Sequence, residues 1–133
     1  MSDHLFPEPE ESLREISVLT AAHIGDAVFE LMVRTWLYKR GAQTAKQLHG
    51  GAVALVSAKA QAAAAGRVLP DLDERELALY KRGRNARASA VPNSATHGEY
   101  HAATGIEALF GYLYLGGRTE RLEELFRKVV EDL

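Results

Sequence analysis

The chain has 133 residues and no cysteine, so it fits one compact domain and cannot contain a disulfide scaffold or a thiolate metal site. Apolar residues make up 47 % of it, which is enough to fold around a core. No stretch is continuously apolar long enough to span a bilayer, so we expect a soluble cytoplasmic protein without a membrane partner. The formal net charge of −2 does not by itself indicate nucleic-acid binding.

Helix signals dominate the first half of the chain. Apolar residues at near-helical spacing predict one long helix over residues 17–40, and Gly41 supplies its stop. Thr44 can cap a helix that runs to about Gly50. An alanine-rich run then predicts another helix over residues 52–67.

A short helix and a long connection are expected next. Asp71 or Asp73 can start a helix that ends near Gly83. The Ser, Pro, Asn, Thr and Gly content of residues 85–97 then predicts a loop. Connections of this length are divided between functional segments and plain surface loops, and the sequence leaves both interpretations open.

Two further helices complete the expected fold. They cover residues 99–115 and the segment from Thr119 to the C-terminus, with a Gly-Gly break between them. No segment alternates as a strand does, so the class is all-α, with about six to seven helices. We expect residues 1–16 to be an N-terminal tail and residues 17–133 to form a single domain.

Cations gather at one place in this mildly acidic chain. The sequence KRGRNAR, residues 81–87, holds four cations and no acid. Cations at the end of a helix can simply favour its C-terminal dipole, or they can neutralise the phosphates of a nucleic acid. The residues of this segment that could contact a nucleic acid are Lys81, Arg82, Arg84, Asn85 and Arg87.

Two acidic residues stand among apolar neighbours inside predicted helices. Asp26 follows Gly25 in HIGDAVFEL, and Glu107 follows Gly105 in TGIEALFGY. A glycine within a helix costs about 1 kcal/mol relative to alanine, and a buried carboxylate without a partner costs several. Each acid could pair with a Lys or Arg or reach the surface. Alternatively, the glycines let the helices pack closely, and the two acids converge on a cation.

Magnesium is the cation that suits such a pair, because it takes oxygen ligands and keeps several waters. The histidines do not indicate zinc: only His97 and His101 have a helical metal spacing, and they lack the acidic context of that motif. No G-x-S-x-G element indicates a serine nucleophile.

Several motifs in order resemble one enzyme family. HIGDAVFELMVR and ATGIEALFGYLYL resemble the two signature helices of ribonuclease III endonucleases. VSAKAQA and KRGRNAR between them resemble the short subfamily called mini-ribonuclease III, which lacks the separate double-stranded-RNA-binding domain. The resemblance covers residues 17–125, nearly the whole chain.

The resemblance implies a fold, a reaction and partners. It implies a ribonuclease III-type helical domain that works as a homodimer and uses Mg²⁺ to cleave double-stranded regions of structured RNA. The implied substrate is the precursor of the large-subunit ribosomal RNA, with ribosomal proteins as candidate accessory factors. Asp26 and Glu107 match the signature acids and are therefore the expected catalytic residues and magnesium ligands.

The chain departs from full-length ribonuclease III at two acidic positions. Ala22 stands where that enzyme has a Glu, and Thr104 stands where it has an Asp. Thr104 could still act through its hydroxyl or a bridging water, and Glu30, one turn beyond Asp26, could support the site or form a salt bridge across the dimer. Two missing acids put tight binding of a second metal ion in doubt.

Two rival functions follow from the same residues. A catalytically inactive RNA-binding or ribosome-assembly protein would explain Ala22 and Thr104, although it has no reason to keep two buried acids. A helical protein–protein adaptor would explain the fold but neither the acids nor the basic segment. Lys59 and Gln61, polar residues in an alanine-rich helix, could face the site or the RNA, or lie on an exposed helical face.

Overall fold

The computed structural model describes residues 9–86, 96–131 and 133, and within them it has seven α-helices, one short 3-10 helix and no strand. The all-α class is therefore confirmed. The helices are α1 (Glu10–Glu15), α2 (Val18–Lys39), α3 (Ala45–Val56), α4 (Ala58–Val68), η1 (Leu69–Asp71), α5 (Glu74–Arg84), α6 (His97–Leu115) and α7 (Thr119–Val129).

Local capping explains where most helices begin and end. Ser17 accepts a hydrogen bond from the amide of Thr20 at the start of α2. Asp73, not Asp71, caps α5 and forms a capping box with Glu76, in which each side chain accepts from the other residue's amide. Gly41 follows the end of α2 and has a φ of 112°, a backbone conformation that glycine adopts far more readily than other residues.

The boundary between α3 and α4 differs from the prediction. The helix capped by Thr44 was expected to end near Gly50, but α3 continues to Val56. Residues 52–56, which were predicted to begin the following helix, therefore belong to α3 and not to α4. A Cβ at Gly51 would lie 2.9 Å from the side chain of Leu37, so this glycine lets α3 pack against α2. The break comes at Ser57, whose extended backbone ends α3 and whose hydroxyl caps α4.

The segment before α2 is partly helical. α1 lies within the residues that we expected to be a tail, and Leu13 and Ile16 pack against buried residues of α2 and α6. The hydroxyl of Tyr112 donates a hydrogen bond to the carbonyl of Ile16 over 3.2 Å, which fastens the end of this segment to α6. The chain is therefore ordered several residues earlier than predicted.

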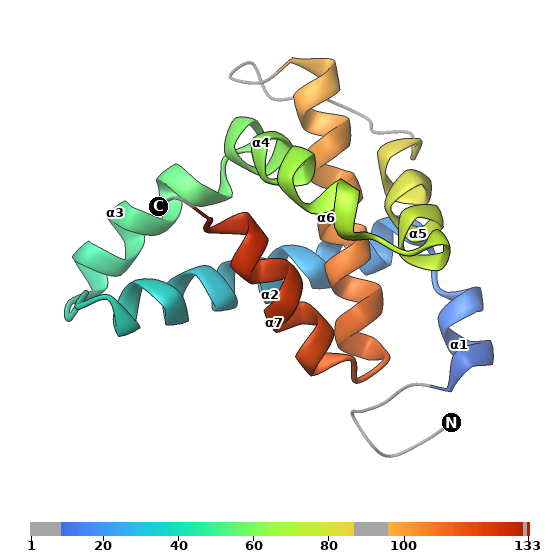
Figure 1. The fold of residues 1–133 in the computed structure, drawn as a ribbon, viewed down its shortest axis with the longest axis horizontal. Coiled ribbons are helices and arrows are strands. Elements are labelled where there is room, and N and C mark those ends of the chain that lie inside the picture. Colours follow the sequence, from blue (N-terminus) through green and yellow to red (C-terminus); the bar gives the residue numbers. More distant parts are fainter. Residues whose placement is uncertain (1–8, 87–95, 132) are drawn as a thin grey trace.

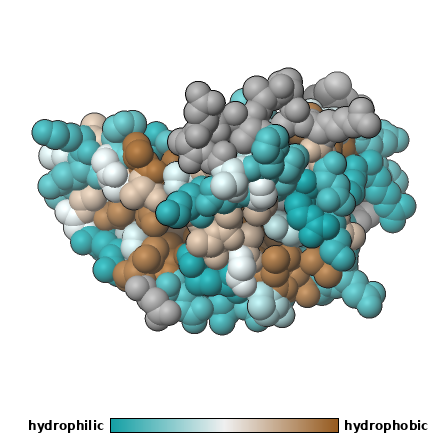
Figure 2. All heavy atoms as spheres, turned by 90° about the horizontal axis from the view of Figure 1, so that it is seen from above, coloured by the Kyte–Doolittle hydropathy of each residue, from teal (hydrophilic) through white to brown (hydrophobic). Residues whose placement is uncertain are grey.

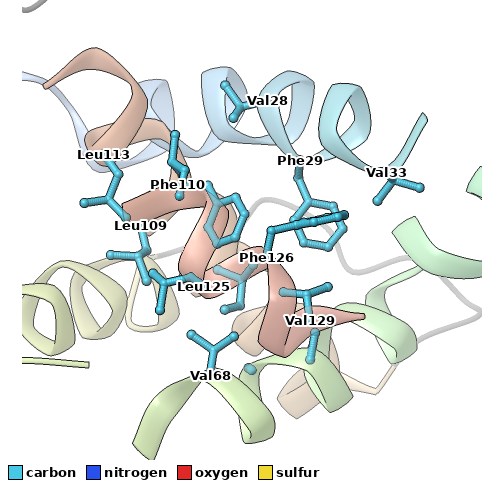
Figure 3. Close-up of a cluster of buried hydrophobic side chains, with 14 of the residues drawn as sticks. Val28, Phe29, Val33, Val68, Leu109, Phe110, Leu113, Leu125, Phe126 and Val129 are labelled. Carbon is cyan, nitrogen blue, oxygen red and sulfur yellow. The ribbon is translucent and has the colours of Figure 1, made fainter. Parts of the chain in front are cut away.

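Helix α6 is the centre of the fold. It crosses α2 and is flanked by α5 on one side and by α4 and α7 on the other (Figure 1). Side chains from α2, α4, α6 and α7 converge in one core (Figure 3). In that core, the ring of Phe29 lies 5.5 Å from that of Phe110 and 6.2 Å from that of Phe126, centroid to centroid. Packing on several faces fixes α6 in position.

The surface is mixed. Hydrophilic side chains cover much of the face seen in Figure 2, and apolar side chains appear there as separate patches. Among the described residues, the large apolar residues most open to solvent are Leu19, Leu31, Tyr38, Val53 and Leu133. No helix in the described part of the chain is long and apolar enough to cross a membrane.

Candidate metal-binding acid pair

The crossing of α2 and α6 depends on two glycines that face each other. A Cβ at Gly25 would overlap the backbone carbonyl of Glu107 and lie 2.8 Å from the amide nitrogen of Gly111. A Cβ at Gly111 would in turn overlap the carbonyl of Ala21. The two helix backbones are therefore in direct contact, as only glycine permits.

This contact brings the two predicted acids together. Asp26 follows Gly25 on α2, and Glu107 is the α6 residue whose backbone lies against Gly25. Asp26 is exposed and Glu107 is half-buried. Their carboxyl groups lie close enough to share a hydrogen bond. The pair therefore opens to solvent at the surface of the crossing, where a large substrate can reach it.

The electrostatics of the pair are unfavourable for two negative charges. Burial, together with hydrogen bonding and charge from the neighbouring Asp26 carboxyl, raises the pKa of Glu107 to about 8, and hydrogen bonding from Gln61 partly offsets this rise. Two carboxyl groups at one site cannot both ionise easily unless a positive charge joins them. An isolated acid pair of this kind holds a proton near neutral pH.

A second buried acid shows what a satisfied carboxylate looks like in this fold. Glu76 is buried, and Arg121 donates to both of its oxygens over 2.7 Å. These hydrogen bonds from Arg121 lower the pKa of Glu76. In the described residues, no Lys, Arg or His forms an ion pair with Asp26 or Glu107. The structural ion pair considered for these two acids is therefore absent from that part of the chain.

The donor set fits a hard divalent cation. Two adjacent carboxylates without a cationic partner supply the oxygen ligands that magnesium prefers, and water completes its octahedral shell. Within residues 9–86, 96–131 and 133, no cluster of three or more His, Cys, Asp or Glu side chains could hold a metal. Asp26 and Glu107 could supply two protein ligands per chain, a number that magnesium accepts because it keeps several waters.

Gly105, the glycine close to Glu107, has a different role from Gly25. Gly105 was expected to open the α6 backbone at the acid site, but it faces α5, where an added Cβ would lie 2.6 Å from the ring of Tyr80. Gly83 on α5 faces the same contact, because its Cβ would lie 2.8 Å from the carbonyl of Thr104. These two glycines bring the basic end of α5 against α6, one turn before Glu107.

The basic segment lies at the C-terminal end of α5. Lys81, Arg82 and Arg84 are exposed there, and Asn85 is the C-cap residue of the helix. The Arg82 guanidinium lies 5.4 Å from the centre of the Tyr112 ring. Arg84 lies 6.0 Å from the Tyr80 ring and donates to the Asn85 side chain.

The remaining part of the basic segment is outside the described residues. That holds for Arg87, a predicted RNA contact, and for most of the loop expected over 85–97. The structural description of this segment therefore rests on Lys81, Arg82 and Arg84.

Two predicted supporting residues are engaged locally. Glu30 forms an ion pair with Arg34 over 2.7 Å, one turn along α2, so its carboxylate points to that partner. Thr104 is buried, and its hydroxyl donates to the carbonyl of Tyr100 over 3.0 Å. Ala22 is also buried, so neither departure from the full-length pattern leaves an exposed gap at the crossing.

Gln61 is the residue whose position the sequence did not settle. Lys59 is exposed, as the helical-face interpretation had it, whereas Gln61 is buried and acts on Glu107. Gln61 shares a buried stripe with Ala64, Ala65 and Val68, at helical spacing. The sequence signal that could have indicated its burial is a single polar residue on an otherwise apolar helical stripe.

Fold and sequence comparisons agree on the class of protein. The sequence matches the Ribonuclease III domain family over residues 19–118, which contain both acids of the pair. The structure superimposes on a crystal structure of a protein from Fusobacterium nucleatum with a TM-score of 0.79 and 32 % sequence identity, covering 89 % of this chain and 96 % of that one. An all-helical domain of this type defines a ribonuclease III-type endoribonuclease.

Individual relatives narrow the class. The chain is 45 % identical to Mini-ribonuclease 3 of Symbiobacterium thermophilum, covering 85 % of this chain and 87 % of the relative. It is 40 % identical to Mini-ribonuclease 3 of a Thermoanaerobacter species, covering 92 % and 89 %. The chain therefore belongs to the mini-ribonuclease III family. The resemblance inferred from the motifs is confirmed.

Proposed function

We propose that this protein uses Mg²⁺, held by Asp26 and Glu107, to cleave double-stranded regions of structured RNA. The observation that carries the proposal is the pair of adjacent carboxyl groups at a glycine-mediated helix crossing, with no cationic partner among the described residues. Such a pair costs stability unless a cation joins it, and ribonuclease III-type chemistry supplies the reason to keep it.

The proposed mechanism divides the work between the acids and the cations. Asp26 and Glu107 hold the divalent ion, which when bound offsets the charge of the phosphodiester and lowers the pKa of water. Lys81, Arg82 and Arg84 neutralise backbone phosphates, and affinity then falls as salt rises. Recognition of the A-form duplex depends mainly on its shape and its 2′-hydroxyls. The chain thus binds and orients the strand next to the acid pair.

A homodimer is part of this proposal. Each chain carries one acid pair, and a duplex has two strands to cut. Leu31 and Tyr38 on α2 are 62 % and 60 % exposed, which is unusual for large apolar side chains and favours a partner surface on this helix. A second copy of the chain that covers this face of α2 would place two acid pairs near one duplex.

The proposed biological substrate is precursor large-subunit ribosomal RNA, processed in the cytoplasm with ribosomal proteins as accessory factors. The support is membership of the mini-ribonuclease III family together with the small size of the domain. A small helical domain has little surface for reading sequence, so a defined terminal stem is a suitable target.

The proposal is tested by cleavage of labelled double-stranded RNA with Mg²⁺ or with EDTA. The native chain is compared with Asp26→Asn and with Asp71→Asn, which changes an exposed Asp whose ion pair with Lys128 is a surface contact. We expect the native chain and Asp71→Asn to cut only with Mg²⁺, and Asp26→Asn to bind without cutting. If no variant cuts but all bind, the protein is a binding relative and the catalytic proposal fails.

The substrate proposal has its own test in the same assay. A stem from the ends of precursor large-subunit ribosomal RNA is compared with an unrelated duplex of equal length. We expect the ribosomal stem to be cut faster and at a defined position. Equal rates and scattered cuts would contradict the ribosomal substrate while leaving the nuclease activity in place.

A further inference from the structure

Gln61 is a buried polar residue that the fold does not satisfy by itself. Its side chain is 2 % exposed, and its Nε2 atom has no hydrogen-bond partner among the described residues. An amide donor left unpaired in an apolar interior costs free energy. An apolar residue of similar size would continue the stripe formed by Ala64, Ala65 and Val68 without this cost. Gln61 therefore requires an explanation beyond packing.

The side chain of Gln61 points toward the acid pair. Helix α4 packs against α6, and the Gln61 amide lies close enough to the Glu107 carboxyl to act on it as a hydrogen-bond donor. Nε2 forms no hydrogen bond among the described residues, so it remains available as a donor. Glu107 is thus approached by Asp26 from α2 and by Gln61 from α4.

We propose that Gln61 is a positioning residue for the metal site: its Nε2 donates to the carboxylate of Glu107 and holds that side chain facing Asp26. This inference rests on the proposed function, because it assigns Gln61 to the same cation site. A carboxylate that binds a cation through one oxygen keeps further acceptor sites, and a donor that occupies one of them fixes its orientation. Helix α4 would then contribute to the site although it supplies no metal ligand.

The test measures metal binding and stability separately. Mn²⁺, which accepts the same oxygen ligands as magnesium, is titrated into the whole chain and followed by the loss of its free-ion EPR signal. Gln61→Met keeps the volume and removes the donor, and Gln61→Asn keeps the amide but shortens its reach. Gln43→Met makes the same chemical change at an exposed glutamine and serves as the matched control. Thermal unfolding without metal is recorded for each variant.

We expect Gln61→Met and Gln61→Asn to bind Mn²⁺ about tenfold more weakly or worse, as loss of a partner to a ligand commonly does. Gln61→Met should unfold at the same temperature as the native chain or a higher one, because it removes an unpaired amide. Gln43→Met should match the native chain in both measurements.

Unchanged Mn²⁺ affinity in both Gln61 variants would overturn the positioning role, whatever their stability. A separate outcome identifies a deeper failure. If Asp26→Asn and Glu107→Gln also bind Mn²⁺ as the native chain does, the acid pair is not the metal site, and the proposed function fails together with the role of Gln61. If Gln61→Met does not fold, the Gln61→Asn titration decides the question.

Discussion

Replacing Gly25 by alanine should separate the two helices that form the acid pair. The added Cβ overlaps the backbone carbonyl of Glu107, and it also lies 2.8 Å from the amide nitrogen of Gly111. Both neighbours are backbone atoms of α6, so no flexible side chain can turn away to make room. The methyl group can be accommodated only if α2 moves relative to α6.

The size of the effect follows from two opposing contributions. Alanine is a better helix former than glycine by about 1 kcal/mol. Overpacking a tight contact costs about 1–3 kcal/mol, and the cost is at the upper end here because the obstacle is backbone. We therefore expect Gly25→Ala to lower the free energy of unfolding by about 2 kcal/mol. Displacing Asp26 by about 1 Å should also slow cleavage about 100-fold.

Gly66→Ala is the matched control for this substitution. Gly66 lies in α4, and a Cβ there meets nothing within 4 Å, so only the gain in helix propensity of about 1 kcal/mol applies. The two variants should differ by about 3 kcal/mol, or about 10 °C in melting temperature for a chain of this size. Urea unfolding at one fixed protein concentration measures the difference. Equal stability and equal cleavage rates for the two variants would refute the close helix crossing.

Three further predictions concern charged groups. Arg121 lowers the pKa of buried Glu76, so that pair stabilises the fold above the usual carboxyl pKa and the contribution is lost in acid. Glu76→Gln should therefore cost about 3 kcal/mol in urea unfolding at pH 7 and much less at pH 3, and an equal cost at both would contradict the pairing. Glu107 has a raised pKa of about 8, so its effect on stability changes with pH in the opposite direction to that of Glu76. Without metal, its contribution to folding stability is complete below a pH of about 4.5 and is lost as the pH rises through 8. Unfolding in EDTA should show that loss in the native chain and not in Glu107→Gln. Finally, Arg84→Ala in the Asp26→Asn background should weaken duplex binding and lower the slope of log affinity against log salt by about one; an unchanged slope would place Arg84 outside the RNA interface.

The helices that could be predicted from the sequence are those with strong local signals. Both α2 and α5 have a capping side chain, and α2 also has a run of apolar residues at helical spacing; both helices were located to within one or two residues. The end of α3 was not predictable in this way. Gly51 looks like a helix end in the sequence, but in the structure it lies inside α3 and makes room for Leu37 of α2. α1 was missed because it is short and has no side-chain cap.

The acid pair was predicted more fully than its surroundings. Glycines close to acidic residues inside apolar helices correctly indicated close helix packing, and Asp26 and Glu107 do lie together. The sequence could not say which glycine meets which helix: Gly25 meets Gly111, whereas Gly105 serves the contact with α5. These pairings depend on how helices cross, which local spacing does not encode. The burial of Gln61 was undecided for the same reason.

The most direct test of the account is a double-mutant cycle on single-turnover cleavage of a duplex RNA. Native chain, Asp26→Asn, Glu107→Gln and the double variant are compared at one Mg²⁺ concentration. If the two carboxylates form one site, either single substitution removes its function, and the double variant should be as slow as the slower single variant to within about threefold. If the losses multiply instead, as for independent residues, the two acids do not act as a unit and the shared cation site is contradicted.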